Sequence, residues 1–544
     1  MKKDKTMVKN SFVSGAFMVT LGIFISKILG IIYVIPFHAV IGEIGGALYG
    51  YAYTIYLFFI SISSAGIPLA ISKVVSEYQT LENYEAKERA FYLGKKIAMI
   101  AGFISFLFLM IFAPLLAQFI LGDLNGGNTV EDVTYVIRVI SIAILIVPLL
   151  SIYRGYFEGH RFMNPPSISQ VIEQIVRITV ILIGSYLILD VFKLSLRDAV
   201  GVALLGATIG AFTAYFYLLK KKFENKRKFI GKSRTALKVT DKQIIHKILY
   251  YAFPLILIDL SKSMYNFVDT FSVVGGLVKY AHYSAVDAEV IVSMLSTWGS
   301  KFNMIVTAIA TGIVVSLIPN LTQSIVKKDH EGTQKIINQS IGMCIFLTIP
   351  MTLGIAFLSQ PIWNLFYGKN IDGFTLLSYY IFTGLFSSIF TVCVTIVQVY
   401  KDYKTLIISL IGGVLIKILF NVRLIYSFYE MGFPPYYGVI TATLFGYLFA
   451  IVYCFIHLAM KRRINFEALL GNFVDILCGT ILMGVVLLVF KLIIPIDSTS
   501  RLINIGIIFL YAVIGMIVYF SFTYRTKTIQ KLFGNRINQI LKKK

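Results

Sequence analysis

Fourteen apolar runs dominate this sequence, and each is about as long as the 20 residues that a helix needs to cross a bilayer. Of the 544 residues 57% are hydrophobic and only 14% are charged, and the mean hydropathy is +0.79. A water-soluble domain could not bury so much apolar surface. The sequence therefore predicts an all-α polytopic membrane protein with fourteen transmembrane helices.

The basic residues are distributed unevenly between the loops that join these runs. With a cytoplasmic N-terminus, 37 of the 50 Lys and Arg residues fall in inner segments and 7 in outer loops. Cytoplasmic loops carry an excess of Lys and Arg in membrane proteins. We therefore expect a multi-pass protein of the plasma membrane with both termini cytoplasmic. The net charge of +23 then needs no nucleic-acid partner.

A basic stretch after the sixth run divides the chain into halves that match in sequence. Ser26-Lys27 in the first half corresponds to Ser261-Lys262 in the second, 235 positions later, and three further pairs follow in the same order. This pattern predicts two six-helix lobes related by a pseudo-twofold axis along the membrane normal, with two further helices at the C-terminal end. The expected domains are an N-terminal lobe (1–222), a basic cytoplasmic linker (223–242), a C-terminal lobe (243–463), spans 13 and 14 (464–524) and a basic cytoplasmic tail (525–544).

Six basic residues fall inside the apolar runs, where an ionised side chain needs a polar cavity or a partner. Three of them, Lys27, Lys262 and Lys301, lie in the first two helices of their halves and could line one cavity. Cations that outnumber the neighbouring carboxylates favour an anionic ligand, and lysine is a common phosphate binder. The alternative is that each amine extends along its span to the membrane surface, and for Lys301 the two interpretations have equal weight.

A second cluster of polar residues lies between spans 4 and 5, in the segment IYRGYFEGHRFMNPPSISQVIEQIVR from Ile152 to Arg177. The pattern R-G-Y-F-x-G, followed by proline and then by S-Q-x-x-E-Q-x-x-R, resembles the polysaccharide-export branch of the MOP superfamily. That branch includes lipid II flippases of the MurJ type and sporulation-associated relatives. The resemblance covers the whole chain and includes S-K-I-L-G at Ser26 to Gly30.

The residues of this segment favour a structural role at least as strongly as substrate contact. Gly155 and Gly159 permit close approach of another backbone. Glu173 and Arg177 lie one helical turn apart and can pair on one face of a helix. We expect a scaffold or a gate made of Arg154, Gly155, Gly159, Glu173, Arg177 and Lys417, the last being the counterpart of Arg177 in the second half.

The family resemblance also implies a mechanism. A cationic cavity is expected to hold the diphosphate of a lipid-linked sugar through Lys27, Lys262 and Lys301, while the polyprenyl tail lies in a groove formed by spans 13 and 14. Tyr33 departs from the pattern, because that branch has a further arginine at its position. Some members bind sodium, and the residues that match such a site in type are Asp259, Asn421 and Thr441.

These observations favour a transporter over an enzyme, since the outer loops are short and the sequence has no nucleotide-binding or metal-enzyme motif. The expected function is a flippase that moves a lipid-linked cell-wall precursor, lipid II in the first place, to the outer leaflet for peptidoglycan synthesis. No cofactor is expected, and Na⁺ or the membrane potential would drive transport. Cell-wall synthesis enzymes are the expected protein partners. The alternatives are a flippase for teichoic-acid, O-antigen-type or spore-cortex precursors, or a multidrug or cation antiporter of the same superfamily.

Overall fold

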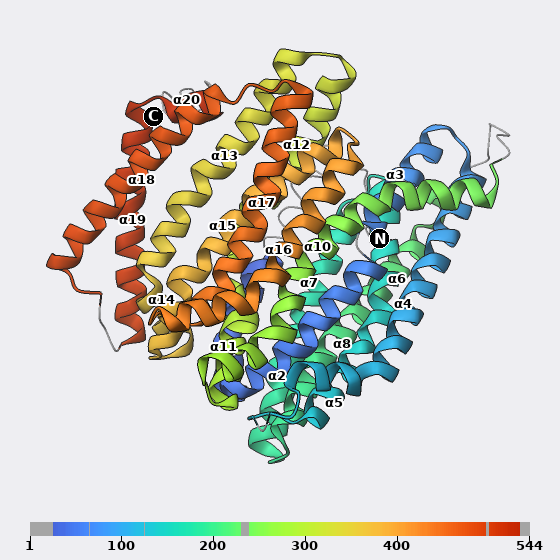
Figure 1. The fold of residues 1–544 in the computed structure, drawn as a ribbon. Coiled ribbons are helices and arrows are strands. Elements are labelled where there is room, and N and C mark those ends of the chain that lie inside the picture. Colours follow the sequence, from blue (N-terminus) through green and yellow to red (C-terminus); the bar gives the residue numbers. More distant parts are fainter. Residues whose placement is uncertain (1–24, 65, 125, 230–238, 497–499, 534–544) are drawn as a thin grey trace, which may run out of the picture. The chain divides into compact units, whose positions relative to one another are not determined.

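The structure is a computed structural model that describes residues 25–64, 66–124, 126–229, 239–496 and 500–533. Its regular elements are all helices, and no strand occurs in those ranges (Figure 1). Thirteen of the helices there are long and apolar enough to cross a membrane. The first predicted run begins before residue 25, so part of it lies outside the described residues. The prediction of an all-α polytopic membrane protein is confirmed.

The chain divides into two compact units. The first is Met1–Val278 with Tyr283–Thr297, and the second is Lys279–His282 with Trp298–Lys544. In the first unit the helices are α2 (Val34–Ser63), α3 (Ile67–Thr80), α4 (Tyr84–Leu121), α5 (Val130–Ser141), α6 (Ala143–Gly159), α7 (Asn164–Thr179), α8 (Leu196–Glu224), α9 (Lys226–Phe229), most of α10 (Asp241–Ala281) and α11 (Ala285–Ser293). In the second they are α12 (Ser300–Val326), α13 (His330–Phe357), α14 (Ser359–Tyr367), α15 (Ile371–Val399), α16 (Tyr403–Glu430), α17 (Tyr436–Arg462), α18 (Glu467–Ile493), α19 (Arg501–Arg525) and α20 (Thr528–Phe533). The predicted domain boundaries rest on the sequence repeat and stay a prediction.

Two glycines interrupt the N-terminal helices. Gly42 has φ 62° and ψ −166° within α2, a conformation that glycine adopts without the steric cost of a Cβ. It marks the change from the first predicted span to the second. Gly66, with φ 71°, precedes α3, whose second residue is Pro68. The second span therefore consists of two helices rather than one.

Other spans contain π-helical turns. One such turn, Val180–Gly184, directly follows α7, and a second covers Leu187–Val191. A third, Met294–Trp298, lies between α11 and α12 in the eighth span. Wider helical turns of this kind are often found at functional sites in proteins, and the sequence periodicity did not predict them.

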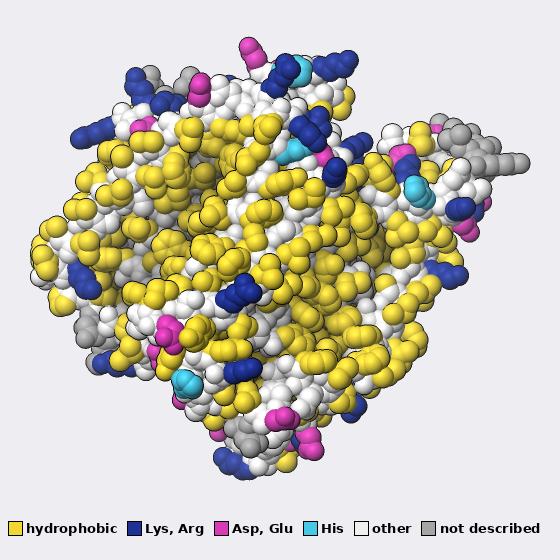
Figure 2. All heavy atoms as spheres, viewed as in Figure 1, with side chains coloured by type: hydrophobic (Ala, Val, Ile, Leu, Met, Phe, Trp, Pro, Cys, Tyr) yellow, Lys and Arg dark blue, Asp and Glu magenta, His cyan; other side chains and the backbone are white. Residues whose placement is uncertain are grey.

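The outer surface of the helices is strongly apolar. On α4, Phe103 and Ile104 are 56% and 61% exposed, and on α19 Phe509 is 71% exposed. Figure 2 shows hydrophobic side chains over most of the visible face. Exposed apolar surface of this extent is stable only against lipid. The protein is therefore a multi-pass membrane protein.

Candidate functional site

An ion network connects α6 and α7 inside the first unit. Arg154 Nη2 donates to Glu173 Oε2 at 2.8 Å, and Arg154 Nε donates to Ser169 Oγ at 2.9 Å. Arg177 Nη2 lies 3.6 Å from the other carboxylate oxygen of Glu173. One carboxylate thus stands between two guanidinium groups. The structure brings together the three charged residues that the sequence motif singled out.

Close backbone contacts fix the helices that carry this network. A Cβ on Gly155 would lie 2.3 Å from Pro68 O, and one on Gly159 would lie 2.7 Å from Ser72 O, so α6 packs directly on α3. The other side of α7 packs on α8 in the same way. Cβ atoms on Gly206 and Gly210 would lie 2.9 Å from Arg177 O and 2.6 Å from Glu173 O. Small residues four apart allow such contacts between membrane helices.

Three tyrosines of α2 surround Arg177. Tyr49, Tyr53 and Tyr56 interact electrostatically with its guanidinium group, and Tyr56 forms a hydrogen bond with it. The rings of Tyr49 and Tyr53 stack with centroids 5.4 Å apart. Arg177 Nε is nevertheless buried without a hydrogen-bond partner in the described part of the chain. The sequence reasoning missed these tyrosines, although their spacing of four and then three residues puts them on one helix face.

Lys27 and Lys262, the matching lysines of the two halves, lie near each other. Both belong to the first unit, both are half-buried, and their charges repel each other. Asp259, one turn before Lys262 on α10, is the carboxylate that offsets part of the positive charge. Because two amines face one carboxylate here, this place has the charge balance expected for an anion.

Several serine hydroxyls occur on the segments that carry the two lysines and on the helices of the first unit that contact each other through serines. Ser61 Oγ of α2 lies 2.8 Å from Ser263 Oγ of α10, and Ser64 Oγ donates to Ser151 Oγ at 2.7 Å. Ser26 Oγ and Ser261 Oγ are buried and have no hydrogen-bond partner among the described residues. These two hydroxyls directly precede Lys27 and Lys262 in the sequence. Both hydroxyls can donate a hydrogen bond to a phosphate oxygen.

At two levels α2 contacts helices that belong to the second half of the sequence, and the first level lies directly after its kink at Gly42. Ser293 Oγ of α11 donates to Glu43 Oε2 at 2.5 Å, and Thr297 Oγ1 donates to Gly46 O at 2.7 Å. The second level lies just beyond the C-terminal end of α2, where a Cβ on Gly66 would lie 2.8 Å from Ala252 O of α10. All these contacts lie within the first unit, and they close the space between α2 and these helices at two levels.

The remaining predicted residues lie in the second unit. Lys301 is the second residue of α12 and is half-buried. Lys417 is fully buried between α16 and α17, where Nζ donates to Val439 O at 2.9 Å and to Thr443 Oγ1 at 2.7 Å. Its partners are backbone and hydroxyl oxygens of neighbouring helices, which suits a residue that holds helices together.

The predicted sodium ligands are divided between the units. Asp259 belongs to the first unit, whereas Asn421 on α16 and Thr441 on α17 belong to the second. Thr441 Oγ1 donates to Tyr437 O at 2.8 Å and lies 3.0 Å from the Tyr379 hydroxyl. Within the described residues, no group of three or more His, Cys, Asp or Glu side chains could hold a metal ion. The oxygen donors suit Na⁺ in type, and the site stays a prediction.

Spans 13 and 14 border an apolar cavity in the second unit. Its volume is about 350 Å³, and it lies between α13, α14, α18 and α19. Most of the wall is aliphatic or aromatic. Its lining residues include Phe346, Met351, Gly354, Met483, Leu487 and Tyr519. The cavity is chemically suited to a hydrocarbon chain and lies where the resemblance implied a groove for a lipid tail.

Comparisons with known proteins agree with this architecture. Residues 12–323 match a family described as polysaccharide biosynthesis protein. The chain is 32% identical to the lipid II flippase MurJ of Bacillus subtilis (strain 168) over 98% of its own length and 99% of that protein. Among solved structures it resembles an inward closed conformation of lipid II flippase MurJ, with a TM-score of 0.63 and 18% identity over 94% of this chain and 99% of that one. It also resembles an inward-facing multidrug resistance MATE family transporter of the MOP superfamily, with a TM-score of 0.60 and 15% identity over 86% and 97%.

Proposed function

The chain belongs to the polysaccharide biosynthesis protein family, and from this premise we propose that it is a flippase for a lipid-linked cell-wall precursor, lipid II in the first place. The lipid II flippase MurJ and the MATE family protein that it resembles are transporters, and this chain is a transporter rather than an enzyme. The observation that carries the proposal is the similarity to the B. subtilis lipid II flippase along nearly the whole chain. The lysine pair of the first unit supports it independently.

The substrate head group would bind at Lys27 and Lys262. A lipid-linked diphosphate carries negative charge at the point where the sugar joins the lipid, and lysine ammonium groups bind such phosphates as point charges. The unpartnered hydroxyls of Ser26 and Ser261, which directly precede the two lysines in the sequence, would add donors to such a site. Lys301 is the third expected contact. Asp259 keeps the site from holding a phosphate too tightly, because it neutralises part of the charge of Lys262.

The polyprenyl tail would stay in an apolar environment throughout transport. The cavity between α13, α14, α18 and α19 offers such a surface beside lipid. Transferring a hydrocarbon tail into it costs little, because the wall has few polar atoms. Only the head group then has to cross the protein interior, which lowers the barrier to translocation.

Alternating access is the proposed mechanism, with the ion network of α6 and α7 as a scaffold. Outward opening requires loss of the contacts of Glu43 with Ser293 and of Gly46 with Thr297, and inward opening requires loss of the contact near Gly66.

With both termini in the cytoplasm, as the loop charges favour, export moves negative charge out of a cell that is negative inside. Each charge gains about 2.3 kcal/mol per 100 mV. Coupling to Na⁺ through Asp259, Asn421 and Thr441, and contacts with cell-wall synthesis enzymes, remain parts of the proposal.

Transport of labelled lipid II in reconstituted vesicles tests this function. We expect Lys27→Ala, Lys262→Ala and Lys301→Ala each to lose most outward exposure of the label, while Lys491→Ala at the far end of α18 keeps it. Depletion of the protein in cells should lead to accumulation of the transported precursor, and this identifies its saccharide. Normal transport by all three lysine variants would rule out the cationic site, and accumulation of another polyprenyl-linked saccharide would replace lipid II as the substrate.

A further inference from the structure

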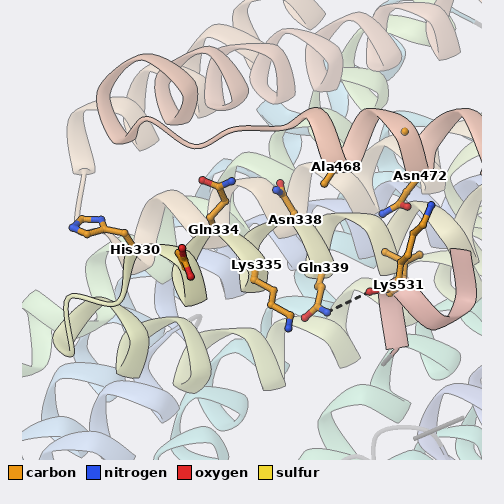
Figure 3. Close-up of a pocket in the computed structure, with 11 residues that line it drawn as sticks. His330, Gln334, Lys335, Asn338, Gln339, Ala468, Asn472 and Lys531 are labelled. Atoms are coloured by element: carbon orange, nitrogen blue, oxygen red, sulfur yellow. Dashed lines mark hydrogen bonds between the residues drawn. The ribbon is translucent and has the colours of Figure 1, made fainter. Parts of the chain in front are cut away.

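A polar pocket lies in the second unit between the first turns of α13, the first turns of α18 and the short helix α20 (Figure 3). Its volume is about 590 Å³. Four amide and three charged side chains contribute to its wall, together with His330, Ala468, Gly471 and Leu532. The side chains that define it are Gln334, Lys335, Asn338, Gln339, Asn472 and Lys531.

Many of the polar groups in this pocket are available to a ligand. Asn338 Nδ2 donates to Asn465 O at 2.8 Å, and its Oδ1 is buried without a partner in the described part of the chain, so this side chain can accept from a ligand hydroxyl but not bind a phosphate oxygen there. Lys335 forms no ion pair among the described residues and is exposed. Lys531 Nζ lies 3.9 Å from Asp475 Oδ2, a long and partly exposed contact, and that oxygen also accepts from Thr528 Oγ1 at 2.8 Å.

The charge balance of the pocket favours a phosphate. Two lysines from different helices line it, and Glu331 in the first turn of α13 is the one carboxylate among the lining residues, with Asp475 beyond the wall 3.9 Å from Lys531. The amide of Asn472 can donate to phosphate oxygens or accept from hydroxyls of the same ligand, and those of Gln334 and Gln339, each with one hydrogen bond of 3.5 Å already, keep a free N–H (Figure 3). Lysines near a membrane surface attract anionic lipid head groups with about 1 kcal/mol each.

The position of the pocket indicates that the phosphate belongs to a lipid. On α18, Leu470 and Val474 beside the pocket are 61% and 57% exposed, as expected for residues that face lipid. Further along α13, Phe346 lines the apolar cavity, and its ring also packs on Phe533 of α20 at 5.6 Å. Asn338 and Phe346 are eight residues apart, which corresponds to about 12 Å along a helix. An amphiphile can therefore place its head in the pocket and its chain on the apolar side of the same helices.

We propose that the pocket between α13, α18 and α20 binds the phosphate head group of a membrane lipid. Two kinds of lipid share this chemistry, an anionic glycerophospholipid and a polyprenyl phosphate. The site is separate from the lysine pair in the first unit, and binding to it does not depend on transport. Its existence can therefore be tested even if the proposed flippase function is wrong.

Native mass spectrometry of the purified full chain tests the proposal, with phosphatidylglycerol, phosphatidylcholine, a polyprenyl phosphate and inorganic pyrophosphate as separate probes. We expect phosphatidylglycerol or the polyprenyl phosphate to bind more tightly than phosphatidylcholine. Affinity should fall about fivefold for each lysine removed in Lys335→Gln and Lys531→Gln. Lys491→Gln, at the other end of α18, should bind like the wild type. The ligand is the lipid, phosphatidylglycerol or the polyprenyl phosphate, for which the two lysine variants have a lower affinity than the wild type.

Mapping with a photoreactive form of that lipid gives a second readout, because cross-links should fall in residues 330–339 and 468–472. Both lysines are exposed, so their variants should fold, and an unchanged melting temperature checks this. Equal lipid binding by the wild type and the double variant would overturn the proposal. Cross-links confined to other helices, or pyrophosphate binding as tight as that of the lipids, would also overturn it.

Discussion

Arg154 of α6 donates to one carboxylate oxygen of Glu173 of α7 at 2.8 Å, while Arg177 lies 3.6 Å from the other. The side chains of all three residues are only 16% exposed. The carboxylate therefore balances two guanidinium groups at the place where α2, α6, α7 and α8 meet. A network of this kind is costly to break, because each remaining charge would be left in a poorly solvated position.

Glu173→Gln should destabilise the protein by about 3 kcal/mol, since the change leaves Arg154 and Arg177 without their shared counter-ion. The measurement is the melting temperature in detergent. Glu131→Gln, at the exposed start of α5, is the control and should melt like the wild type. Adding Arg154→Gln to Glu173→Gln should recover part of the lost stability, because substitutions at residues in contact do not have additive effects on stability. A Glu173→Gln protein as stable as the wild type would show that the network contributes no stability.

Gly155→Ala should destabilise the contact between α3 and α6. The new methyl group would lie 2.3 Å from Pro68 O, so the two backbones must separate, at a cost of about 1 to 3 kcal/mol. Gly275→Ala on α10 is a matched control, because no atom lies within 4 Å of the position of its Cβ. We expect a lower yield of folded protein and a lower melting temperature for Gly155→Ala alone. Equal behaviour of the two variants would contradict the close packing.

Gly354→Leu should fill part of the apolar cavity without straining the helix that carries it. No atom lies within 4 Å of a Cβ at this position, and the residue lines the cavity. If the polyprenyl tail occupies the cavity, transport of labelled lipid II should fall while the melting temperature stays the same or rises. Gly506→Leu on the exposed side of α19 is the control and should transport normally. Full transport by Gly354→Leu would remove this cavity from the mechanism.

Asp402, between α15 and α16, should make stability depend on pH. Burial acts to raise the pKa of this carboxyl, but the Thr405 backbone N–H at 3.3 Å and the His457 ring at 2.7 Å outweigh it, so the pKa is lowered. A carboxyl whose pKa is lowered in the folded state stabilises that state at pH values above its pKa in the unfolded chain, which is about 4. This stabilisation is lost as the pH falls through the pKa of the folded state. Asp402→Asn should therefore melt below the wild type at pH 7, and the two should converge below about pH 4. Asp123→Asn, in an exposed loop, should melt like the wild type at every pH. If the melting temperatures of Asp402→Asn and the wild type differed by the same amount at every pH, the prediction would be wrong.

Much of the fold could be predicted because membrane spans depend on local composition. The transfer free energy of a helix is a sum over its own residues, and apolar runs reveal it directly. For the same reason the sequence located the lysines inside the spans, and helical spacing paired Glu173 with Arg177. Gly155 and Gly159 were recognised as points of close approach, although their partners on α3 were not.

The sequence by itself determined that the chain is a helical membrane protein, which family it resembles and which cations fall within its apolar runs. Only the tertiary structure decided how each cation is satisfied. Lys417 donates to oxygens of α17, Arg177 lies among the tyrosines of α2, and Lys262 lies near Lys27 and has Asp259 as its counter-ion. The pocket of Asn338 and Lys531 joins segments almost 200 residues apart. The physical reason is that insertion depends on each span alone, whereas charge compensation depends on which helices pack together, and that choice is made by contacts far apart in the sequence.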